Sequence, residues 1–476
     1  MSDTAERSPT DNVYGTTYHT PDPSNPKVLI IGAGLGGLTL GILLERAGID
    51  YEIFERARSI RPIGSATGIS PNILPLLEQL GLIDELRAIW KEFMSITVYK
   101  EMPDGETFEE LSKTNNAPIE KLSGYHPVVM SRPGLQNTLL SRIPQHKIHL
   151  NKRILDVTQG IDSGVQIRCS DGMSHEGDIL VGCDGAYSGV RQAMYRRMKD
   201  AGQLPSSDDV DLKVVHLSIL GTTNPLDPSV VPFPEDGYGR FHAVLGHEKP
   251  YAWRIFETPD NCLCWRIDVQ LQSTSFSDND SFRSTDWGSK SNKKEIKEEW
   301  RKFRMPVGSG KTVSLGELID NTTEENVTKV MLEEKLYTTW YHHRVVLLGD
   351  CGVNAMLDAV VLANELYEIS NKADYDNITK AFKNYYNERY PRAKMDFDNS
   401  NQAASLLAGQ SWFDKMLRKF MFHFMPQTLL RITYTKTLAY RPQASFLPKI
   451  PYRGTGHVEP QKESKKYKKL MTASHL

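Results

Sequence analysis

Residues Val28 to Glu55 read VLIIGAGLGGLTLGILLERAGIDYEIFE, and this stretch decides how the chain folds. An apolar run comes first and predicts a buried strand, and Gly32, Gly34 and Gly37 follow it in GxGxxG spacing. The next residues repeat apolar side chains at the helical period, and a second short strand ends at Glu55. This order of strand, glycine turn, helix, strand and acid predicts a dinucleotide-binding unit.

Each glycine has a separate physical role in such a unit. Gly32 permits a tight turn, Gly34 lets the backbone approach a pyrophosphate, and Gly37 lets the helix pack closely on the strand. The helix N-terminus adds unpaired N–H groups and a partial positive charge, which favour phosphate. Glu55, eighteen residues after Gly37, can accept hydrogen bonds from an adenosine ribose. A structural glycine turn without a ligand is the alternative, but the flanking strands, helix and acid favour the dinucleotide.

Length, charge and the first residues narrow the class of protein. A chain of 476 residues exceeds what one hydrophobic core usually supports, so we expect two or more subdomains. The formal net charge of -2 argues against nucleic acid as the main partner. Residues 1–26 contain no apolar core that could act as a signal peptide, and they read as a disordered leader. We therefore expect a cytoplasmic location and reduced cysteines.

The five cysteines do not indicate a metal site. Cys262 and Cys264 form a CxC pair in a segment that reads as a strand, where the period of two places both on one face. No second pair of cysteine or histidine residues with metal-ligand spacing accompanies them. We therefore predict no bound metal.

The middle of the chain follows a different pattern. From Leu212 to about Leu271, apolar and polar residues alternate with a period of two, which predicts a half-buried antiparallel sheet. A buried-strand pattern returns at RVVLLGD, residues Arg344 to Asp350, and an apolar helix follows. Strands expected beside the first strand are thus separated from it by a whole antiparallel sheet. The predicted fold class is α/β, with a Rossmann-type domain, an inserted antiparallel β-sheet domain and a helical C-terminal region.

The stretch WFDKMLRKFMFHFM, residues 412–425, has aromatic and apolar side chains on one broad helical face and charged side chains on the other. A helix that packs on its own domain or on a partner subunit is the favoured interpretation. The alternative is peripheral membrane contact through an interfacial helix, helped by the basic tail around Lys465 to Lys469. The stretch carries too many charges to span a bilayer.

Three stretches in this order resemble the signatures of one family. They are GAGLGG to Glu55, GDILVGCDGAYSGVR from Gly177 to Arg191, and RVVLLGD from Arg344 to Asp350. Together they resemble those of the FAD-dependent group A monooxygenases, which have the p-hydroxybenzoate-hydroxylase-like fold. The similarity is nearest to fungal salicylate-hydroxylase-like and secondary-metabolite FAD monooxygenases.

This resemblance implies FAD as cofactor and NAD(P)H as co-substrate, without a separate NAD(P)H domain. It implies that NAD(P)H reduces the flavin, that O2 adds at the flavin C4a carbon, and that the hydroperoxide hydroxylates or epoxidises the substrate. The protein itself supplies binding, orientation and exclusion of water. The expected substrate is a small apolar aromatic or polycyclic metabolite, but no motif identifies it and none separates NADH from NADPH.

The resemblance also assigns candidate cofactor residues. The glycine-rich turn becomes the FAD pyrophosphate site, and Glu55 matches the acid that binds the ribose. Arg132 matches the arginine that reaches the FAD phosphates, a task that suits the guanidinium fork, although a surface charge at a helix start is the alternative. Gly68, in GSATGISPN, matches the loop that runs along the flavin.

Three further cofactor candidates follow buried strands. Asp184 matches the acid of the DG motif near the FAD and NAD(P)H pyrophosphates, although it could instead cap the next helix. Asp350 matches the acid that hydrogen-bonds the ribityl chain of FAD. Val353 belongs to the helix start that would point at the flavin.

Catalytic candidates are fewer. Arg191 ends the SxVR element, where it could contact phosphate or substrate, or form a structural ion pair. Tyr238 lies with Arg240 in the first part of the inserted sheet, where substrate pockets of the family form, although each could be an ordinary sheet or loop residue. His342 and His343 precede a buried strand and are interpreted as surface or packing residues.

The third signature departs from the family pattern. Only the three residues CGV separate Asp350 from Asn354, so about ten residues of the pattern are absent. Those residues normally wrap the pyrophosphate and the pyrimidine edge of the flavin. Three explanations stay open. The first is that the sequence lacks a segment of a working enzyme, because the transcript was mis-spliced or the gene limits were assigned wrongly. The second is that the protein binds FAD more weakly. The third is that it is a flavin-free relative that acts as a binding protein, cyclase or isomerase.

The patterns and the resemblance together predict the domain limits. A discontinuous FAD-binding domain holds an inserted substrate domain, between a leader and a C-terminal helical region with a basic tail. The predicted limits are 1–26 for the leader, 27–95, 131–210 and 341–400 for the FAD-binding domain, 96–130 and 211–340 for the substrate domain, and 401–476 for the C-terminal region.

Overall fold

The structure is a computed structural model, and it describes residues 24–60, 65–161, 163–210, 214–247, 249, 251–270, 296–308, 310–333, 335–349, 352–369, 371, 374–408, 416 and 427–473. Its first layer is a six-stranded sheet in the order β19-β20-β11-β1-β2-β7, parallel except between β19 and β20. The strands are β1 (Val28–Ile31), β2 (Tyr51–Phe54), β7 (Ile148–His149), β11 (Ile179–Gly182), β19 (Tyr341–His342) and β20 (Val345–Leu347).

Both faces of the parallel sheet are buried, because alternate residues of β1 enter different cores. Val28 and Ile30 share a core with α1 (Leu35–Ala47) and α9 (Gly352–Tyr367). Leu29 and Ile31 pack with residues of β8 (Ile154–Gly160), β9 (Gly164–Cys169) and α6 (Gly189–Asp200). Successive side chains of a strand point to opposite faces, so a strand covered on both sides needs a continuous apolar run such as VLII.

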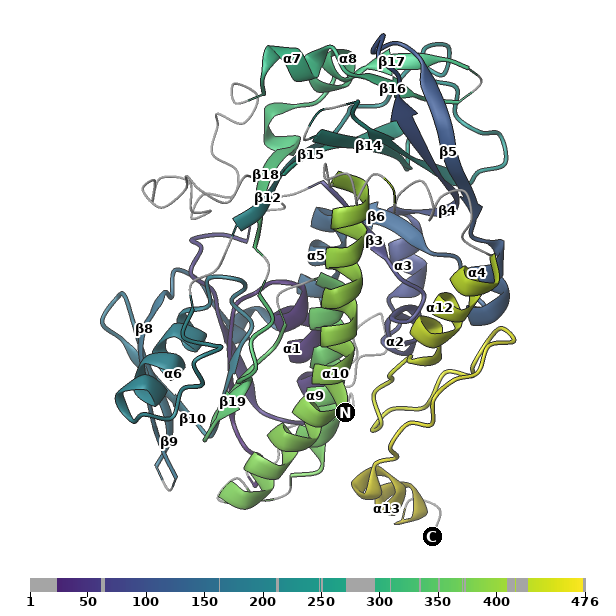
Figure 1. The fold of residues 1–476 in the computed structure, drawn as a ribbon. Coiled ribbons are helices and arrows are strands. Elements are labelled where there is room, and N and C mark those ends of the chain that lie inside the picture. Colours follow the sequence, from purple (N-terminus) through teal and green to yellow (C-terminus); the bar gives the residue numbers. More distant parts are fainter. Residues whose placement is uncertain are drawn as a thin grey trace, which may run out of the picture.

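The second large sheet has nine strands and lies above the parallel sheet in Figure 1. Its order is β18-β12-β15-β14-β13-β4-β6-β3, and β5 pairs with β4. The strands are β3 (Ala66–Ile69), β4 (Trp90–Glu101), β5 (Phe108–Asn115), β6 (Val128–Ser131), β12 (Val214–Thr222), β13 (Gly239–Leu245), β14 (Tyr251–Thr258), β15 (Cys262–Gln270) and β18 (Val327–Glu333). Neighbours are antiparallel apart from β4 and β13, so the antiparallel strands predicted between residues 212 and 271 are confirmed.

Alternation of side chains gives the nine-stranded sheet two different faces. The outer face carries Trp253 and Trp265 in a core with α7 (Glu298–Arg301), α8 (Leu315–Asp320), β16 (Arg304–Pro306) and β17 (Thr312–Ser314). The opposite face, which we call the inner face, is turned toward the parallel-sheet half (Figure 1). On this face Ser65 Oγ, just before β3, lies 2.5 Å from Thr222 Oγ1. The inner-face residues used below are Ser218, Thr222, Phe241, Arg254, Phe256, Cys264, Arg266 and Asp268.

The other elements are helical apart from one strand. They are α2 (Leu74–Gln79), α3 (Ile83–Arg87), α4 (Ala117–Ser123), α5 (Arg132–Leu140), η1 (Gln145–Lys147), β10 (Ser174–Gly177), η3 (Glu324–Asn326), α10 (Tyr375–Ala408), α12 (Gln427–Ala439) and α13 (Lys465–Ala473). Ser131 precedes α5, and its hydroxyl caps this helix by accepting from Gly134 N at 3.2 Å. The predicted α/β fold class is confirmed, whereas the domain limits stay a prediction.

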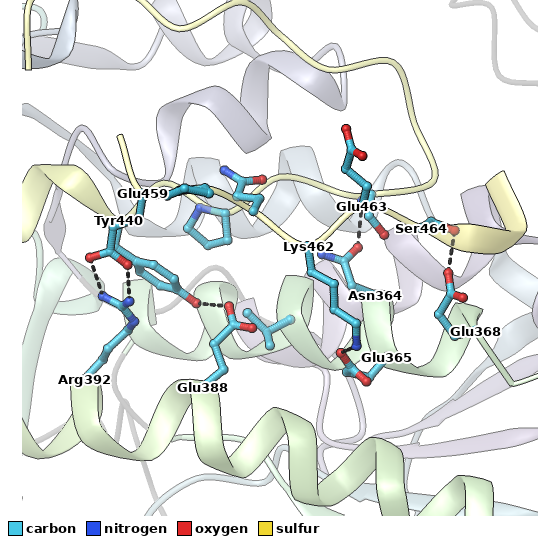
Figure 2. Close-up of a pocket in the computed structure, with 15 residues that line it drawn as sticks. Asn364, Glu365, Glu368, Glu388, Arg392, Tyr440, Glu459, Lys462, Glu463 and Ser464 are labelled. Atoms are coloured by element: carbon cyan, nitrogen blue, oxygen red, sulfur yellow. Dashed lines mark hydrogen bonds and ion pairs between the residues drawn. The ribbon is translucent and has the colours of Figure 1, made fainter. Parts of the chain in front are cut away.

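Residues 440–464, which we call the C-terminal strap, lie against α9 and α10 (Figure 2). Ion pairs between Arg392 and Glu459 and between Lys462 and Glu365 fasten the strap to the two helices. A cavity of about 290 Å³ lies between them. These acidic side chains already have basic partners, so we interpret the strap as structural.

Two predicted segments fall mostly outside the described residues. Of the leader, residues 1–26, only 24–26 are described, and of the amphipathic stretch 412–425 only Met416. Both interpretations of that stretch therefore stay predictions. Within the ranges described, no helix is long and apolar enough to cross a membrane.

Candidate cofactor site

The three glycines after β1 behave differently when a Cβ atom is placed on each. Gly32 has a φ of 106°, and its Cβ would lie 2.5 Å from the carbonyl oxygen of Cys183. A Cβ on Gly37 would lie 2.0 Å from the carbonyl oxygen of Gly32. Nothing lies within 4 Å of a Cβ on Gly34. Two glycines thus serve the fold itself, while Gly34 leaves the side of the turn on which a ligand can approach.

The start of α1 suits an anion. Its N-cap is Gly34, which has no side chain to accept from the N–H groups of the first turn, and this fully described helix has no acidic residue there. Such N–H groups and the partial positive charge of the helix favour phosphate oxygens. The turn therefore fits the pyrophosphate of a dinucleotide.

Glu55 follows β2 and faces the same turn. Its Oε2 accepts a hydrogen bond from Ala33 N at 2.9 Å, and its Oε1 accepts one from Ala57 N at 2.9 Å. A carboxylate offers about four lone-pair positions, so both oxygens can still accept from ribose hydroxyls. The two backbone bonds hold the carboxylate beside the turn, as the ribose assignment requires.

Helix α5 brings Arg132 to this edge of the sheet. Gln136 Nε2 donates to the carbonyl oxygen of Ala33 at 3.1 Å, which ties the helix to the glycine turn. Arg132 lies four residues earlier, and residues with that spacing share one face of a helix. Its backbone N–H donates to Ser65 O at 3.0 Å. Gly68, in neighbouring β3, is exposed, and nothing lies within 4 Å of a Cβ placed on it.

Asp184 caps a helix. Its carboxylate accepts from Ser188 Oγ at 2.5 Å and from Gly189 N at 2.6 Å, at the start of α6. Burial raises the pKa of this carboxyl, against the opposing effect of these hydrogen bonds. Its Cα lies 3.1 Å from a Cβ placed on Gly32, so Asp184 also borders the glycine turn. A contact with a pyrophosphate stays a prediction.

The starts of α1 and α9 lie side by side. A Cβ on Gly36 would lie 2.9 Å from the Cβ of Ala355, and one on Gly352 would lie 3.5 Å from Leu35 Cδ1. Val353, half-buried in the first turn of α9, is therefore near the pyrophosphate turn. Asp350 lies outside the described residues, so its predicted contact with the ribityl chain stays a prediction.

A buried ion pair supports the shortened link before α9. Asp358 Oδ2 accepts from Gly349 N at 2.7 Å, and its Oδ1 lies 2.6 Å from Arg389 Nε. Arg389 Nη2 also donates to Asn354 Oδ1 at 3.3 Å. Strand β20 is therefore present before the shortened link and helix α9 after it, and the side chain of Asp358 connects the two segments.

The two catalytic candidates lie in different surroundings. Arg191, in α6, is 9% exposed, donates from Nη2 to Ala186 O at 2.5 Å and lies 4.2 Å from the ring centroid of Tyr337. Tyr238 precedes β13, and its ring centroid is 5.1 Å from that of His126. A structural role for Arg191 explains all of its recorded contacts, and neither catalytic role is tested by them.

Residues outside the motifs also build this edge. Gln136 and Asp358 were not among the predicted site residues. Each forms a hydrogen bond with a backbone atom that comes close to it only in the folded chain. A signal for Asp358 does exist, since it is a lone acid in the apolar run AMLDAVVLA. A charged residue inside such a helix needs a buried partner, here Arg389.

The fold and this sheet edge define a dinucleotide-binding α/β protein. The profile of the family described as "FAD binding domain" matches residues 25–400, so the chain belongs to that family. FAD as cofactor and the resemblance to FAD-dependent group A monooxygenases are thereby confirmed.

Relatives and solved structures agree with this assignment. The FAD-dependent monooxygenase atmM of Aspergillus flavus is 25% identical over 92% of this chain and 90% of its own length. The FAD-dependent monooxygenase ausM of Penicillium brasilianum is 27% identical over 90% and 88%. HpxO of Klebsiella pneumoniae, solved with FAD and uric acid, shares the fold with a TM-score of 0.67 at 19% identity, over 87% of this chain and 97% of that one.

Proposed function

We propose that the protein is an FAD-dependent monooxygenase that uses NAD(P)H and O2 to hydroxylate or epoxidise a small apolar aromatic or polycyclic metabolite. The observation that carries the proposal is the meeting of an open glycine turn, a ribose acid and an arginine-bearing helix start at one sheet edge, in a chain of the FAD-binding family. The names of the fungal relatives support oxygenation, and they favour a role in secondary metabolism.

The roles of the cofactor residues follow from their chemistry. The first-turn N–H groups of α1 and the guanidinium of Arg132 bind the pyrophosphate, and Glu55 binds the ribose. Gly68 and Val353 would lie beside the flavin. When bound, FAD supplies electron transfer from NAD(P)H and activation of O2.

The inner face of the nine-stranded sheet receives the substrate. Phe241 and Phe256 stack on each other there with ring centroids 5.9 Å apart, and they form an apolar patch. Ser65, next to the start of β3, contacts Thr222 and Cys264 of this face, and its carbonyl oxygen accepts from Arg132 N, so a molecule on this surface would lie close to the cofactor residues. Tyr238 and Arg191 remain catalytic candidates, and we expect Arg191 to act by ordering the segment after Asp184.

A flavin spectrum followed by oxygen uptake tests the proposal. We expect the purified protein to be yellow, to release FAD on denaturation and to consume NADH or NADPH together with O2. Glu55→Gln should weaken FAD binding, because a neutral amide accepts ribose hydrogen bonds less strongly. A protein that retains no flavin and consumes no NAD(P)H with added FAD would contradict the proposal.

One observation favours a second candidate function. Only residues 350 and 351 separate Gly349 from the start of α9, where the family pattern has a longer loop. A flavin-free relative that binds an apolar metabolite, or isomerises or cyclises it, would need no such loop. A colourless preparation that still binds apolar aromatic compounds would favour this function, and sequencing the transcript across codons 350 to 354 would test for a missing segment.

A further inference from the structure

The inner face carries a group of charged residues that no part of the proposed mechanism uses. Arg254 in β14 is paired in register with Arg266 in β15. Directly opposed residues of like charge destabilise a sheet unless another group neutralises them. The inner face therefore holds two guanidinium groups at a position where an ordinary sheet would avoid them.

One carboxylate is shared by the two arginines. Arg254 Nη2 lies 3.2 Å from Asp268 Oδ2, and Arg266 Nε lies 2.7 Å from Asp268 Oδ1. Among the described residues, Asp268 is the acidic partner recorded for both guanidiniums. Burial would raise the pKa of Asp268, but Arg254 and Arg266 hold it below its ordinary value. Two cations and one anion leave this cluster with a net positive charge.

The remaining hydrogen bonds fix the geometry of the cluster. Arg266 Nη2 donates to Ser218 Oγ at 3.0 Å, and the Ser218 hydroxyl donates to Asp268. Ser218 is 1% exposed and the Asp268 side chain 7%. The Asp268 carboxylate and the Ser218 hydroxyl are thus buried.

The two arginine side chains, in contrast, are partly exposed. The side chain of Arg254 is 20% exposed and that of Arg266 is 30% exposed. Burial lowers the pKa of Arg254, as expected for a cation in a poorly solvated position. A guanidinium offers five N–H donors, and one carboxylate cannot accept all of those of two arginines.

The cluster stands beside the apolar surface assigned to the substrate. Arg254 is followed two residues later on the same face by Phe256, which stacks on Phe241. Arg266 is two residues from Cys264, whose Sγ lies 2.8 Å from Ser65 Oγ. Two residues of a strand span roughly 7 Å, the width of a fused ring system. An aromatic surface and a cationic site therefore lie within the reach of one small molecule.

We propose that Arg254 and Arg266 together bind an acidic oxygen of the substrate, so that the substrate is an apolar ring system bearing a carboxylate or an enolate-type oxygen. Asp268 and Ser218 position the two guanidiniums and do not contact the substrate. This inference rests on the proposed function for the identity of the site as the substrate site. It narrows the substrate from apolar polycyclic compounds in general to their anions.

Calorimetric titration with two probes tests the proposal. 2-Naphthoate and 2-naphthamide have the same ring system, and only the first is an anion. We expect the wild-type protein to bind 2-naphthoate tighter by roughly ten-fold or more, the value of one charge-assisted hydrogen bond. Arg254→Gln and Arg266→Gln should each remove most of this preference while leaving 2-naphthamide binding unchanged.

Two further variants separate recognition from folding. Asp268→Asn removes the competing anion, so its preference for 2-naphthoate should rise, an effect that a merely structural role would not produce. Arg301→Gln is the matched control, because Arg301 is 28% exposed and pairs with Asp320 on the layer beyond the outer face. This variant should bind both probes as the wild type does. Thermal melting of every variant establishes that it is folded.

Several outcomes would overturn the proposal. The first is a wild-type protein that binds the two probes equally or does not bind 2-naphthoate. The second is a full preference for 2-naphthoate in folded Arg254→Gln and Arg266→Gln. The third is displacement of 2-naphthoate by acetate at equal concentration. The last result would mark a general small-anion site. Flavin content is measured separately in each preparation. A colourless protein with the preference would refute only the monooxygenase, and a yellow protein without it would refute only the anion site.

Discussion

The glycine-rich edge of the parallel sheet and the inner face of the nine-stranded sheet are built in different ways. At the first, the proposed cofactor site consists of a turn that is open at Gly34 and the N–H groups of α1, so it depends on backbone geometry. At the second, side chains such as Arg254 and Phe256 decide, and the backbone is an ordinary strand. A site made of backbone groups requires fixed residue spacing, whereas a site on a sheet face requires only the period of two that any half-buried strand shows.

The largest expected effect on stability tests whether the glycine-rich edge of the parallel sheet also depends on one side chain. Asp358→Asn would leave Arg389, which is 1% exposed, without its anionic partner. Breaking a buried pair in this way costs about 3–5 kcal/mol of unfolding free energy. Urea denaturation of the flavin-free protein measures it. Asp398→Asn breaks the exposed pair with Lys394, and its effect should be far smaller, because solvent screens such a pair.

The next effect concerns a buried acid of the nine-stranded sheet. Burial raises the pKa of Glu257 from 4.5 to about 7, although Lys91 Nζ lies 3.7 Å away. The protonated form is thus favoured in the folded state, so its stabilising contribution is complete below pH 4.5 and is lost as the pH rises to about 7. The loss is about 3 kcal/mol at 1.36 kcal/mol per pKa unit.

Urea denaturation at several pH values measures this dependence. Glu257→Gln should flatten the fall in stability between pH 4.5 and about 7, because the amide does not titrate. Glu109→Gln, at a half-exposed position beside Lys100, should leave the slope as it is in the wild type. An unchanged slope in Glu257→Gln would show that other groups cause the dependence.

A smaller effect separates the glycines that the fold requires from Gly34, which we propose the ligand requires. A Cβ at Gly37 would lie 2.0 Å from Gly32 O, so Gly37→Ala must push the helix from the strand. Overpacking of this kind costs about 1–3 kcal/mol. The unfolding free energy of flavin-free protein measures it, and Gly34→Ala is the matched variant that should cost almost nothing.

The smallest effect on stability accompanies a clear effect on binding. Gly34 has an ordinary φ of -78°, and a side chain there meets no protein atom within 4 Å. Gly34→Val should change the unfolding free energy by less than about 0.5 kcal/mol. It should weaken FAD binding at least roughly ten-fold, since the branched side chain occupies the approach of the pyrophosphate. Full affinity for FAD, measured by flavin fluorescence, would place the pyrophosphate elsewhere.

The sequence allowed the first region to be predicted much further than the second. One short stretch of sequence predicted the first strand, the glycine turn, α1 and the position of Glu55, because neighbouring residues determine each of them. The hydrogen bond from Gln136 to Ala33 joins residues 103 apart in the chain, and no local sequence pattern predicts it. The same holds for Arg254 and Arg266, since only the strand register makes them neighbours.

The contact between Gly36 and Ala355 has a consequence for the order of events during synthesis. These residues meet at the starts of α1 and α9, yet the ribosome makes Ala355 319 residues after Gly36. At 5–20 residues per second the interval is roughly 15 to 60 seconds. Throughout that time the nascent glycine turn lacks one wall, and α1 lacks the helix α9 on which it packs, although α5 has already been made. FAD is therefore expected to bind only once the inserted sheet has been completed.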